Sequence, residues 1–334
     1  MMGNRIIWTI ISVILWIPLI CCTNDGSQSF EELMVIVDSL EADSSFVEAK
    51  AFIEANWSSG DHEFERLQEL VYLNEKLLLY EDNLAIWDSG HVKDFFFLIH
   101  PDLPRFRPYT GFTNFMQIAQ RNQLLRAEAI QQARTTWEIL PPLRKDVEKT
   151  YPAVFIFHGG GSSLQKARAR WKFSDSFRDS TIIVYFQSYR NYTSNTYGWR
   201  TGDQRGLMEL DSCFRDILTQ YPIDETQITL SGISAGASIA IDVGLRGTIP
   251  SARVVAFCPG YPRDVFKDSL VIPDPPFIEI IAGETDFYGD PQVTLCESLE
   301  RLEISYSYRI IEGLDHDLPG DYEEFIYTAM FSGN

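Results

Sequence analysis

One serine, Ser234, stands in a pattern that can turn its hydroxyl into a nucleophile. The pentapeptide Gly232-Ile-Ser-Ala-Gly236 directly follows a strand-like run, Ile228-Thr-Leu230, and directly precedes a helix-like run. A chain that turns so sharply from strand to helix holds the serine in a strained conformation with its Oγ exposed. Glycines two residues before and after the serine are needed because side chains there would clash across the turn. The pattern therefore predicts a serine that attacks a carbonyl carbon.

A serine nucleophile needs a general base, and the sequence offers few candidates. Of the five histidines, only His316 follows Ser234 along the chain, in the polar loop Gly313–Asp317. Folds that carry this serine turn present their residues in the order serine, acid, histidine. His316 is therefore the expected base. We expect His158 to brace its own loop and the remaining three histidines to be structural or surface residues: His62, His91 and His100.

A glycine run, Gly159 to Gly161, follows His158 at the end of the apolar stretch Val154–Phe157. Such a run can cradle a phosphate or form a plain turn. It lacks both the Gly-Lys-Ser/Thr ending of a phosphate-binding loop and the spacing of a dinucleotide-binding loop. At a strand end, ahead of the serine turn, it favours backbone N–H groups aimed at a developing oxyanion.

These motifs, in this order, make residues 150–331 resemble an α/β-hydrolase of the esterase/lipase type. Within that group the segment is most similar to compact serine esterases such as carboxylesterases and feruloyl esterases. The resemblance implies an oxyanion hole formed by the N–H groups of Ala235, Gly160 and Gly161. It also implies that no metal or organic cofactor is used.

The acid of the site should follow the strand Phe277–Ala282, where two carboxylates stand close together. The resemblance favours Asp286, which matches the family's Gly-x-x-Asp placement, and Glu284 is the alternative. His316 then takes the proton of Ser234, and Asp286 fixes the imidazole tautomer and stabilises its charged form. We expect a small-molecule carboxylic ester as the substrate. The alternatives are a peptidase or thioesterase with the same triad, and a helical interaction module with a scaffold hydrolase domain.

The intervals between these residues limit where a substrate lid can come from. Asp286 follows Ser234 by 52 residues and His316 follows Asp286 by 30, so neither interval has room for a large cap. A lid must come from the helical N-terminal region or from the loop Tyr189–Gly202, which is rich in aromatic and amide side chains. This loop is either ordinary surface or a pocket wall that stacks on a sugar or phenolic group. Arg200 and Arg205 are candidates to meet an acidic substrate.

The second half of the chain predicts the elements that position these residues, a mostly parallel sheet covered by helices on both faces. Apolar strand-like runs alternate there with amphipathic helical runs. The expected strands are Ala153–Phe157, Thr181–Phe186, Gln227–Leu230, Arg253–Phe257, Phe277–Ala282 and Ser305–Ile310. The expected helices are Gln204–Gln220, Ala235–Leu245, Gln292–Leu302 and Tyr322–Phe331. Because Cys258 stands in an apolar run, we expect it to be a small buried residue.

The sequence predicts an all-helical region over residues 30–148, followed by the catalytic domain over 149–334. Apolar residues recur at helical spacing before Leu78 and again over about 112–140, with a proline-rich loop, Pro101 to Gly111, between them. The expected succession of helical hairpins resembles tetratricopeptide-type repeats, but no repeated consensus sequence is present. The stripe of aromatic residues between Phe95 and Phe115 is expected to form core. Nothing in this region predicts chemistry.

Residues 1–22 predict a signal segment or a membrane anchor. Arg5 precedes fifteen uncharged residues, Ile6 to Ile20, and a polar stretch follows. The export prediction therefore covers secretion, an uncleaved anchor, and a lipoprotein whose lipid attaches at Cys21 or Cys22. The three cysteines beyond this segment are far apart and argue against a disulfide scaffold and against zinc.

The chain of 334 residues carries a formal charge of −19, from 47 acidic and 28 basic residues. The charge is even along the sequence, with 22 acidic and 12 basic residues over 22–150 and 25 and 15 over 151–334. This balance argues against binding to a nucleic-acid backbone, which needs clustered Lys and Arg. The acidity indicates a solvated exterior. It does not identify a protein partner.

Overall fold

The computed structural model describes residues 29–57, 60, 62–144, 146, 148–267 and 272–331. The chain divides into two compact units, Met1–His62 and Glu63–Asn334, and each is considered by itself. The predictions of export, cleavage and lipid attachment for residues 1–22 lie outside the described residues. Within the described ranges, no helix combines the length and the apolar character needed to cross a bilayer.

The first unit is a pair of helices, α1 (Phe30–Ala42) and α2 (Phe46–Asn56). Ser29 begins α1 with a reciprocal cap, since its Oγ accepts from the Glu32 N–H while the Glu32 carboxylate accepts from the Ser29 N–H. This arrangement satisfies N–H groups that a helix start leaves unpaired. Buried side chains at spacings of four residues, such as Leu33 and Val37, form the core of the pair.

The second unit opens with α3 (Glu63–Lys76), α4 (Tyr80–His91), a 3₁₀ helix η1 (Pro104–Gly111) and α5 (Phe115–Gln132). These helices share one hydrophobic core, in which aromatic rings dominate, as the sequence predicted. Four of its large side chains are almost fully buried: Trp87, Phe106, Tyr109 and Phe115. The prediction that helices precede the sheet is confirmed. The proline-rich loop contains η1, because proline at a first helical position has the backbone angle that a helix needs.

The predicted helix over 112–140 was wrong at its C-terminal end. The helix α5 ends at Gln132, and residues Thr136–Leu140 form the strand β1, which pairs antiparallel with β3 (Ile182–Gln187). Trp137 and Ile139 are a β-favouring pair on alternating positions of this short run. The edge of β3 offers unpaired backbone groups at this point. Hydrogen bonds to these groups stabilise an extended conformation of residues 136–140 more than the helical spacing of their apolar side chains stabilises a helix.

The second unit then forms a seven-stranded sheet in the order β1-β3-β2-β4-β5-β6-β7. All pairs after β1 are parallel. The strands are β2 (Tyr151–Phe157), β3, β4 (Ile223–Ile233), β5 (Arg253–Phe257), β6 (Phe277–Gly283) and β7 (Tyr306–Ile311). All six strands predicted after residue 149 are present. Because they are parallel, their carboxyl ends lie along one edge of the sheet, where open α/β sheets bind ligands.

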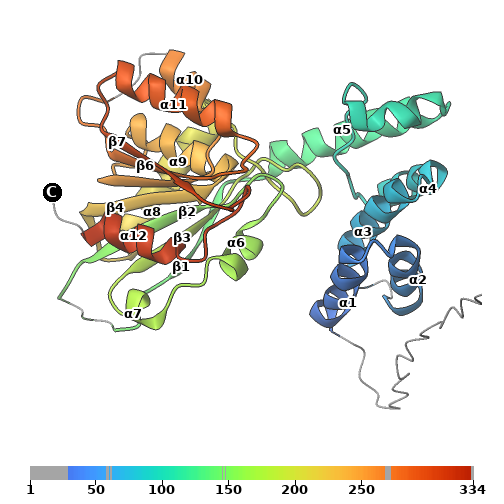
Figure 1. The fold of residues 1–334 in the computed structure, drawn as a ribbon, viewed down its shortest axis with the longest axis horizontal. Helices are drawn as coiled ribbons and strands as arrows, with labels where there is room; N and C mark the ends of the chain where they lie inside the picture. The colour runs from blue at the N-terminus through green and yellow to red at the C-terminus, as the bar shows by residue number, and fades with distance from the viewer. Residues whose placement is uncertain are drawn as a thin grey trace, which may run out of the picture. The chain divides into compact units, whose positions relative to one another are not determined.

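Helices cover both faces of the sheet (Figure 1). One hydrophobic cluster packs α8 (Gln204–Gln220), α9 (Ala235–Leu245) and α11 (Gly289–Arg301) against the sheet, with α10 (Arg263–Lys267) beside them. A second cluster packs α6 (Leu164–Arg170), α7 (Asp175–Arg178) and α12 (Tyr322–Phe331) on the other face. Strands buried on both sides explain the continuous apolar runs in the sequence.

Candidate active site

Ser234 occupies the sharp turn that the sequence predicted between β4 and α9. Its backbone angles are φ 57° and ψ −121°, a region that side chains rarely adopt. The Ser234 N–H donates to the Phe257 carbonyl (2.9 Å), which ties the turn to the end of β5. A Cβ at Gly232 would lie 2.5 Å from the Gly236 carbonyl carbon, and one at Gly236 would overlap the Phe157 carbonyl oxygen. The glycines therefore allow the backbone approach that holds the strained serine.

His316 and Asp286 meet at the same edge of the sheet. Asp286 follows β6 and His316 follows β7, and His316 Nδ1 lies 2.8 Å from Asp286 Oδ1. A Cβ on Gly283, at the end of β6, would overlap the carbonyl oxygens of Leu314 and Asp315, so glycine lets the histidine loop approach. Of the two predicted acids, Asp286 is the one in contact with His316.

The other flanking carboxylates have separate partners. Glu284 accepts a hydrogen bond from the Gly313 N–H (2.9 Å), at the start of the histidine loop. Asp317 forms an ion pair with Arg170 of α6. Both carboxylates hold the histidine loop by its flanks and leave Asp286 to bond the imidazole.

Asp286 is nearly buried and surrounded by donors. Its Oδ1 accepts from the Tyr288 N–H (2.9 Å), and its Oδ2 accepts from Gln292 Nε2 (2.6 Å). Burial by itself raises the pKa of Asp286, but the hydrogen bonds from Tyr288, His316 and Gln292 outweigh it and keep the pKa below its usual value. The carboxylate is therefore ionised at neutral pH and accepts a hydrogen bond from the His316 Nδ1–H. The roles of Tyr288 and Gln292 had no signal in the sequence.

Cys258, fully buried as predicted, also lies beside the acid and the histidine. The ligand-type atoms of Cys258, Asp286 and His316 all lie within 4.8 Å of one another. Burial raises the pKa of Cys258 to about 12, so the thiol is protonated at neutral pH. The thiol lies 3.5 Å from the Asp317 carbonyl oxygen, to which it can donate, so Cys258 belongs to the hydrogen-bonded cluster around the histidine loop. The sequence did not indicate this contact.

His158 braces the glycine loop, as predicted. It is fully buried, its Nδ1 lies 2.7 Å from the Gly159 carbonyl, and its Nε2 accepts from the Ser188 N–H (3.3 Å). The Trp199 indole N–H donates to the His158 carbonyl (2.9 Å). Burial lowers the pKa of His158 to about 4, so the ring is neutral and donates through Nδ1. This hydrogen bonding fixes the first residue of the loop.

Two of the three predicted oxyanion donors are available. Ala235 is the first residue of α9, where an N–H has no acceptor within the helix. Within the described part of the chain, no acceptor bonds the Gly160 N–H, and a Cβ on Gly160 would lie 3.4 Å from the Ala235 Cβ. The Gly161 N–H, in contrast, donates to the Tyr197 carbonyl (2.8 Å). The prediction for Gly161 is wrong, because its positive φ of 72° turns that N–H toward the 189–202 loop.

Two cavities border the turn. The first, of about 270 Å³, is lined by both Ser234 and His316 and also by Gly160, Trp171 and Phe287. The second, of about 480 Å³, is lined by Ala235 and by side chains of the 189–202 loop and of α10. Phe287 and Tyr288 pack on the His316 ring at centroid distances of 4.2 and 5.2 Å, and each lines one cavity.

The helices before the sheet support the 189–202 loop. Phe96 and Ser194 exchange two hydrogen bonds, from the Phe96 N–H to Ser194 Oγ (2.8 Å) and from the Ser194 N–H to the Phe96 carbonyl (3.1 Å). Arg126 of α5 donates to the Asn191 carbonyl (2.9 Å) and lies 5.7 Å from the Tyr192 ring. Since Tyr192 lines the second cavity, this loop forms a pocket wall, which was one of the two interpretations of its sequence. The helices hold that wall in place.

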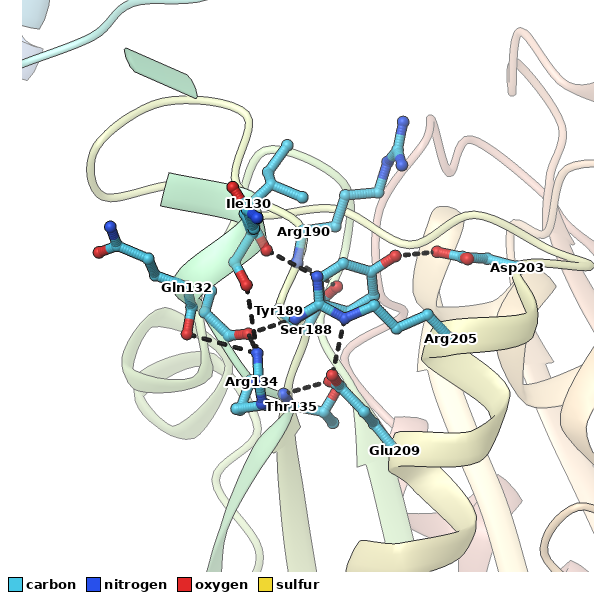
Figure 2. A network of polar contacts seen from close by, with 12 residues as sticks. Ile130, Gln132, Arg134, Thr135, Ser188, Tyr189, Arg190, Asp203, Arg205 and Glu209 are labelled. Carbon is cyan, nitrogen blue, oxygen red and sulfur yellow. Dashed lines mark hydrogen bonds and ion pairs between the residues drawn. The ribbon is translucent and has the colours of Figure 1, made fainter. Parts of the chain in front are cut away.

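Arg205 lines neither cavity, so it is not placed to contact an acidic substrate there, as the sequence had led us to expect for Arg200 or Arg205. Figure 2 shows its guanidinium inside a network that joins the end of α5 to the start of α8. It donates to the carbonyl oxygens of Ile130 (2.8 Å) and Ala133 and pairs with Glu209 (2.8 Å). Arg205 therefore satisfies carbonyl groups left unpaired at a helix end. Arg200, the other candidate, does line the second cavity.

Comparisons with known proteins give likenesses of fold. No family model matches the chain, and no curated protein matches its sequence. An uncharacterized protein from Bacillus cereus ATCC 10987 is 19% identical with a TM-score of 0.48, over 91% of this chain and 99% of that one. Esterase PE8 is 21% identical with a TM-score of 0.47, over 59% and 96%. A CE1 ferulic acid esterase from Anaeromyces mucronatus is 17% identical with a TM-score of 0.45, over 60% and 90%.

The arrangement of the sheet identifies the fold on its own terms. Ser234 follows β4, Asp286 follows β6 and His316 follows β7, all at the carboxyl ends of parallel strands. The serine turn, the glycine loop after β2 and the antiparallel edge strand complete the pattern. Residues 136–331 have the α/β-hydrolase fold, and helices precede them.

Proposed function

We propose that this protein is a serine hydrolase that cleaves carboxylic esters through Ser234, His316 and Asp286. One observation carries the proposal: the strained Ser234 and the hydrogen-bonded His316 border the same cavity. A serine held at φ 57° costs conformational free energy of about 1–3 kcal/mol, which a merely structural turn has no reason to retain.

The proposed reaction follows from the groups around the cavity. Ser234 Oγ attacks the ester carbonyl carbon while His316 Nε2 takes the Oγ proton, and Asp286 stabilises the imidazolium. The Gly160 and Ala235 N–H groups stabilise the tetrahedral oxyanion. His316 then gives the proton to the departing alkoxide, and the C–O bond breaks to leave an acyl-Ser234. Water, deprotonated by His316, attacks the acyl carbon; the bond between that carbon and Ser234 Oγ then breaks, His316 returns the proton to Oγ, and the acid leaves.

Active-site labelling tests the nucleophile. The full chain should react with a fluorophosphonate probe, and Ser234→Ala should abolish labelling and lower ester turnover at least about 10³-fold. Ser176→Ala removes an exposed hydroxyl elsewhere on the same domain and should leave both unchanged. Labelling that survives in Ser234→Ala would refute the assignment of the nucleophile.

The substrate class is tested by comparing leaving groups on one enzyme preparation. Short p-nitrophenyl esters should be hydrolysed far faster than peptide p-nitroanilides, because an amide nitrogen leaves less readily than a phenoxide. Amide hydrolysis without ester hydrolysis would replace this proposal with the peptidase alternative. Labelling without turnover of either class would support the thioesterase alternative, and thioester substrates would then be tried.

A further inference from the structure

Basic side chains, and no acidic ones, are found among the described residues that line the two cavities beside Ser234. Lys166 and Arg170 line the first cavity, and Arg200 and Arg263 line the second. No aspartate or glutamate is among the described residues that line either one. With 47 acidic and 28 basic residues in the chain, a mixed lining is the ordinary expectation.

Two other cavities of the same domain have that mixed lining. One is lined by Arg144 and Lys149 together with Asp146 and Asp179. Another is lined by Arg246 and Asp211. The purely basic lining is therefore a property of the two cavities at the serine turn and not of cavities in this protein generally.

The guanidinium groups in the second cavity are not used by the fold. Within the described residues, neither Arg200 nor Arg263 forms an ion pair. Asp264, the carboxylate next to Arg263 in sequence, pairs instead with Lys267 (3.9 Å). Both side chains are exposed and line the same cavity, so an anionic ligand bound there can accept charge-assisted hydrogen bonds from them.

The rest of the second cavity is aromatic and firmly held. Its walls include Tyr192, Trp199, Tyr261 and Tyr288. The Tyr192 ring packs against Gly198, where a Cβ would overlap it, and Tyr261 stacks on Phe266 at 5.4 Å with an interplanar angle of 6°. Aromatic walls suit a flat group, and guanidinium groups match the geometry of a carboxylate.

We infer that the substrate of this site is an ester that carries a carboxylate on a flat arm, and that Arg200 and Arg263 bind that carboxylate in the second cavity. The inference rests on the proposed function, since it names the substrate of the same serine. The arm passes Ala235, the residue next to the nucleophile that also supplies an oxyanion donor. Lys166 in the first cavity adds a positive charge and favours the approach of an anion to an otherwise acidic protein, whereas Arg170 is paired with Asp317.

Matched ester pairs test the inference, with the carboxylate on either side of the scissile bond. 4-Acetoxybenzoate is compared with 4-acetoxybenzamide, and monomethyl terephthalate with methyl 4-carbamoylbenzoate. The readout is the ratio of kcat/KM for the anionic ester to that for the neutral ester, corrected for their rates with hydroxide. In at least one pair this ratio should be about tenfold, the size of a charge-assisted hydrogen bond in a partly exposed site. It should fall as salt is added.

Paired substitutions locate the effect. Arg200→Gln with Arg263→Gln should bring the ratio to within about twofold of one. Arg144→Gln with Arg215→Gln removes the same charge from exposed sites elsewhere and should leave the ratio unchanged. A ratio near one in the unsubstituted enzyme, with the neutral esters cleaved, overturns the inference and leaves the proposed function standing. A ratio that survives the Arg200/Arg263 substitutions also overturns it. Absence of both turnover and probe labelling overturns the proposed function itself.

Discussion

The buried, neutral His158 predicts a specific loss of stability at mildly acidic pH. In the unfolded chain an imidazole takes up a proton near its ordinary pKa of about 6.5. In the folded protein, burial lowers the pKa of His158 to about 4, because a charge on the ring would have to be desolvated beside the glycine loop. Between these two values the unfolded state binds more protons than the folded state. Acid therefore favours unfolding in that window.

The magnitude follows from the two pKa values. Each unit of separation is worth about 1.4 kcal/mol, so lowering the pH from 7 to 4.5 should lower the free energy of unfolding by roughly 2–3 kcal/mol through His158 alone. Below about pH 4 the folded protein also takes up the proton, and this contribution no longer changes. A loss of about 2–3 kcal/mol is a large fraction of the stability of an ordinary domain, about 5–15 kcal/mol.

Urea unfolding of the intact chain and of His158→Asn, at pH 7 and at pH 4.5, measures the effect. The asparagine amide can still donate to the Gly159 carbonyl but cannot titrate. The variant loses the acceptor for the Ser188 N–H and should be less stable than the intact chain at pH 7, by a margin that shrinks at pH 4.5. Carboxylates titrate in both proteins, so the difference between their pH dependences isolates His158. If both proteins lose the same free energy between the two pH values, the buried neutral imidazole is refuted.

Three further predictions concern the site and its support. Asp286→Asn should lower kcat for esters by about 10⁴-fold, because the imidazole loses its orienting acceptor. In the control variant, Glu284→Gln, kcat should stay within about twofold of the intact chain. Equal losses in steady-state assays would contradict the assignment of the acid. Gly236→Ala should lower the thermal midpoint and abolish probe labelling, since its Cβ meets the Phe157 carbonyl oxygen; a stable, labelled variant would refute the backbone argument. Arg205→Met should lower the free energy of unfolding in urea by about 1–3 kcal/mol. Arg215→Met, at an exposed position of the same helix and outside the network, should lower it by less than about 0.5 kcal/mol. Similar losses would show that Arg205 does not stabilise the network in Figure 2.

The position of the aromatic loop links the two parts of the second unit. Arg126 of α5 and Phe96 of the segment between α4 and η1 both bond the loop that forms a wall of the second cavity. The region before the sheet thus contributes to the shape of the cavity without lining it, since the described residues around both cavities all lie between Gly159 and His316. This gives the helical region a role in positioning the pocket.

The main strands and the serine turn were predictable because their causes are local. A strand buried on both faces must be apolar along its whole length, and the Gly232–Gly236 turn needs glycine wherever backbone meets backbone. His316 was predictable for a different reason: it is the sole histidine after Ser234 in the chain. The strand β1 was not predictable, because Thr136–Leu140 extends only where the edge of β3 is there to pair with it.

The sequence by itself determined which reactive groups are present and in what order. A nucleophile, an acid and a histidine that each follow a parallel strand must lie along the same edge of the sheet, where they can meet. Only the tertiary structure decided which groups are free to act. It engages the Gly161 N–H with Tyr197, commits Arg205 to the end of α5, and surrounds Asp286 with donors that include Gln292. The physical reason is that a hydrogen bond or an ion pair has one geometry, and partners distant along the chain compete for each group only once the fold has brought them together.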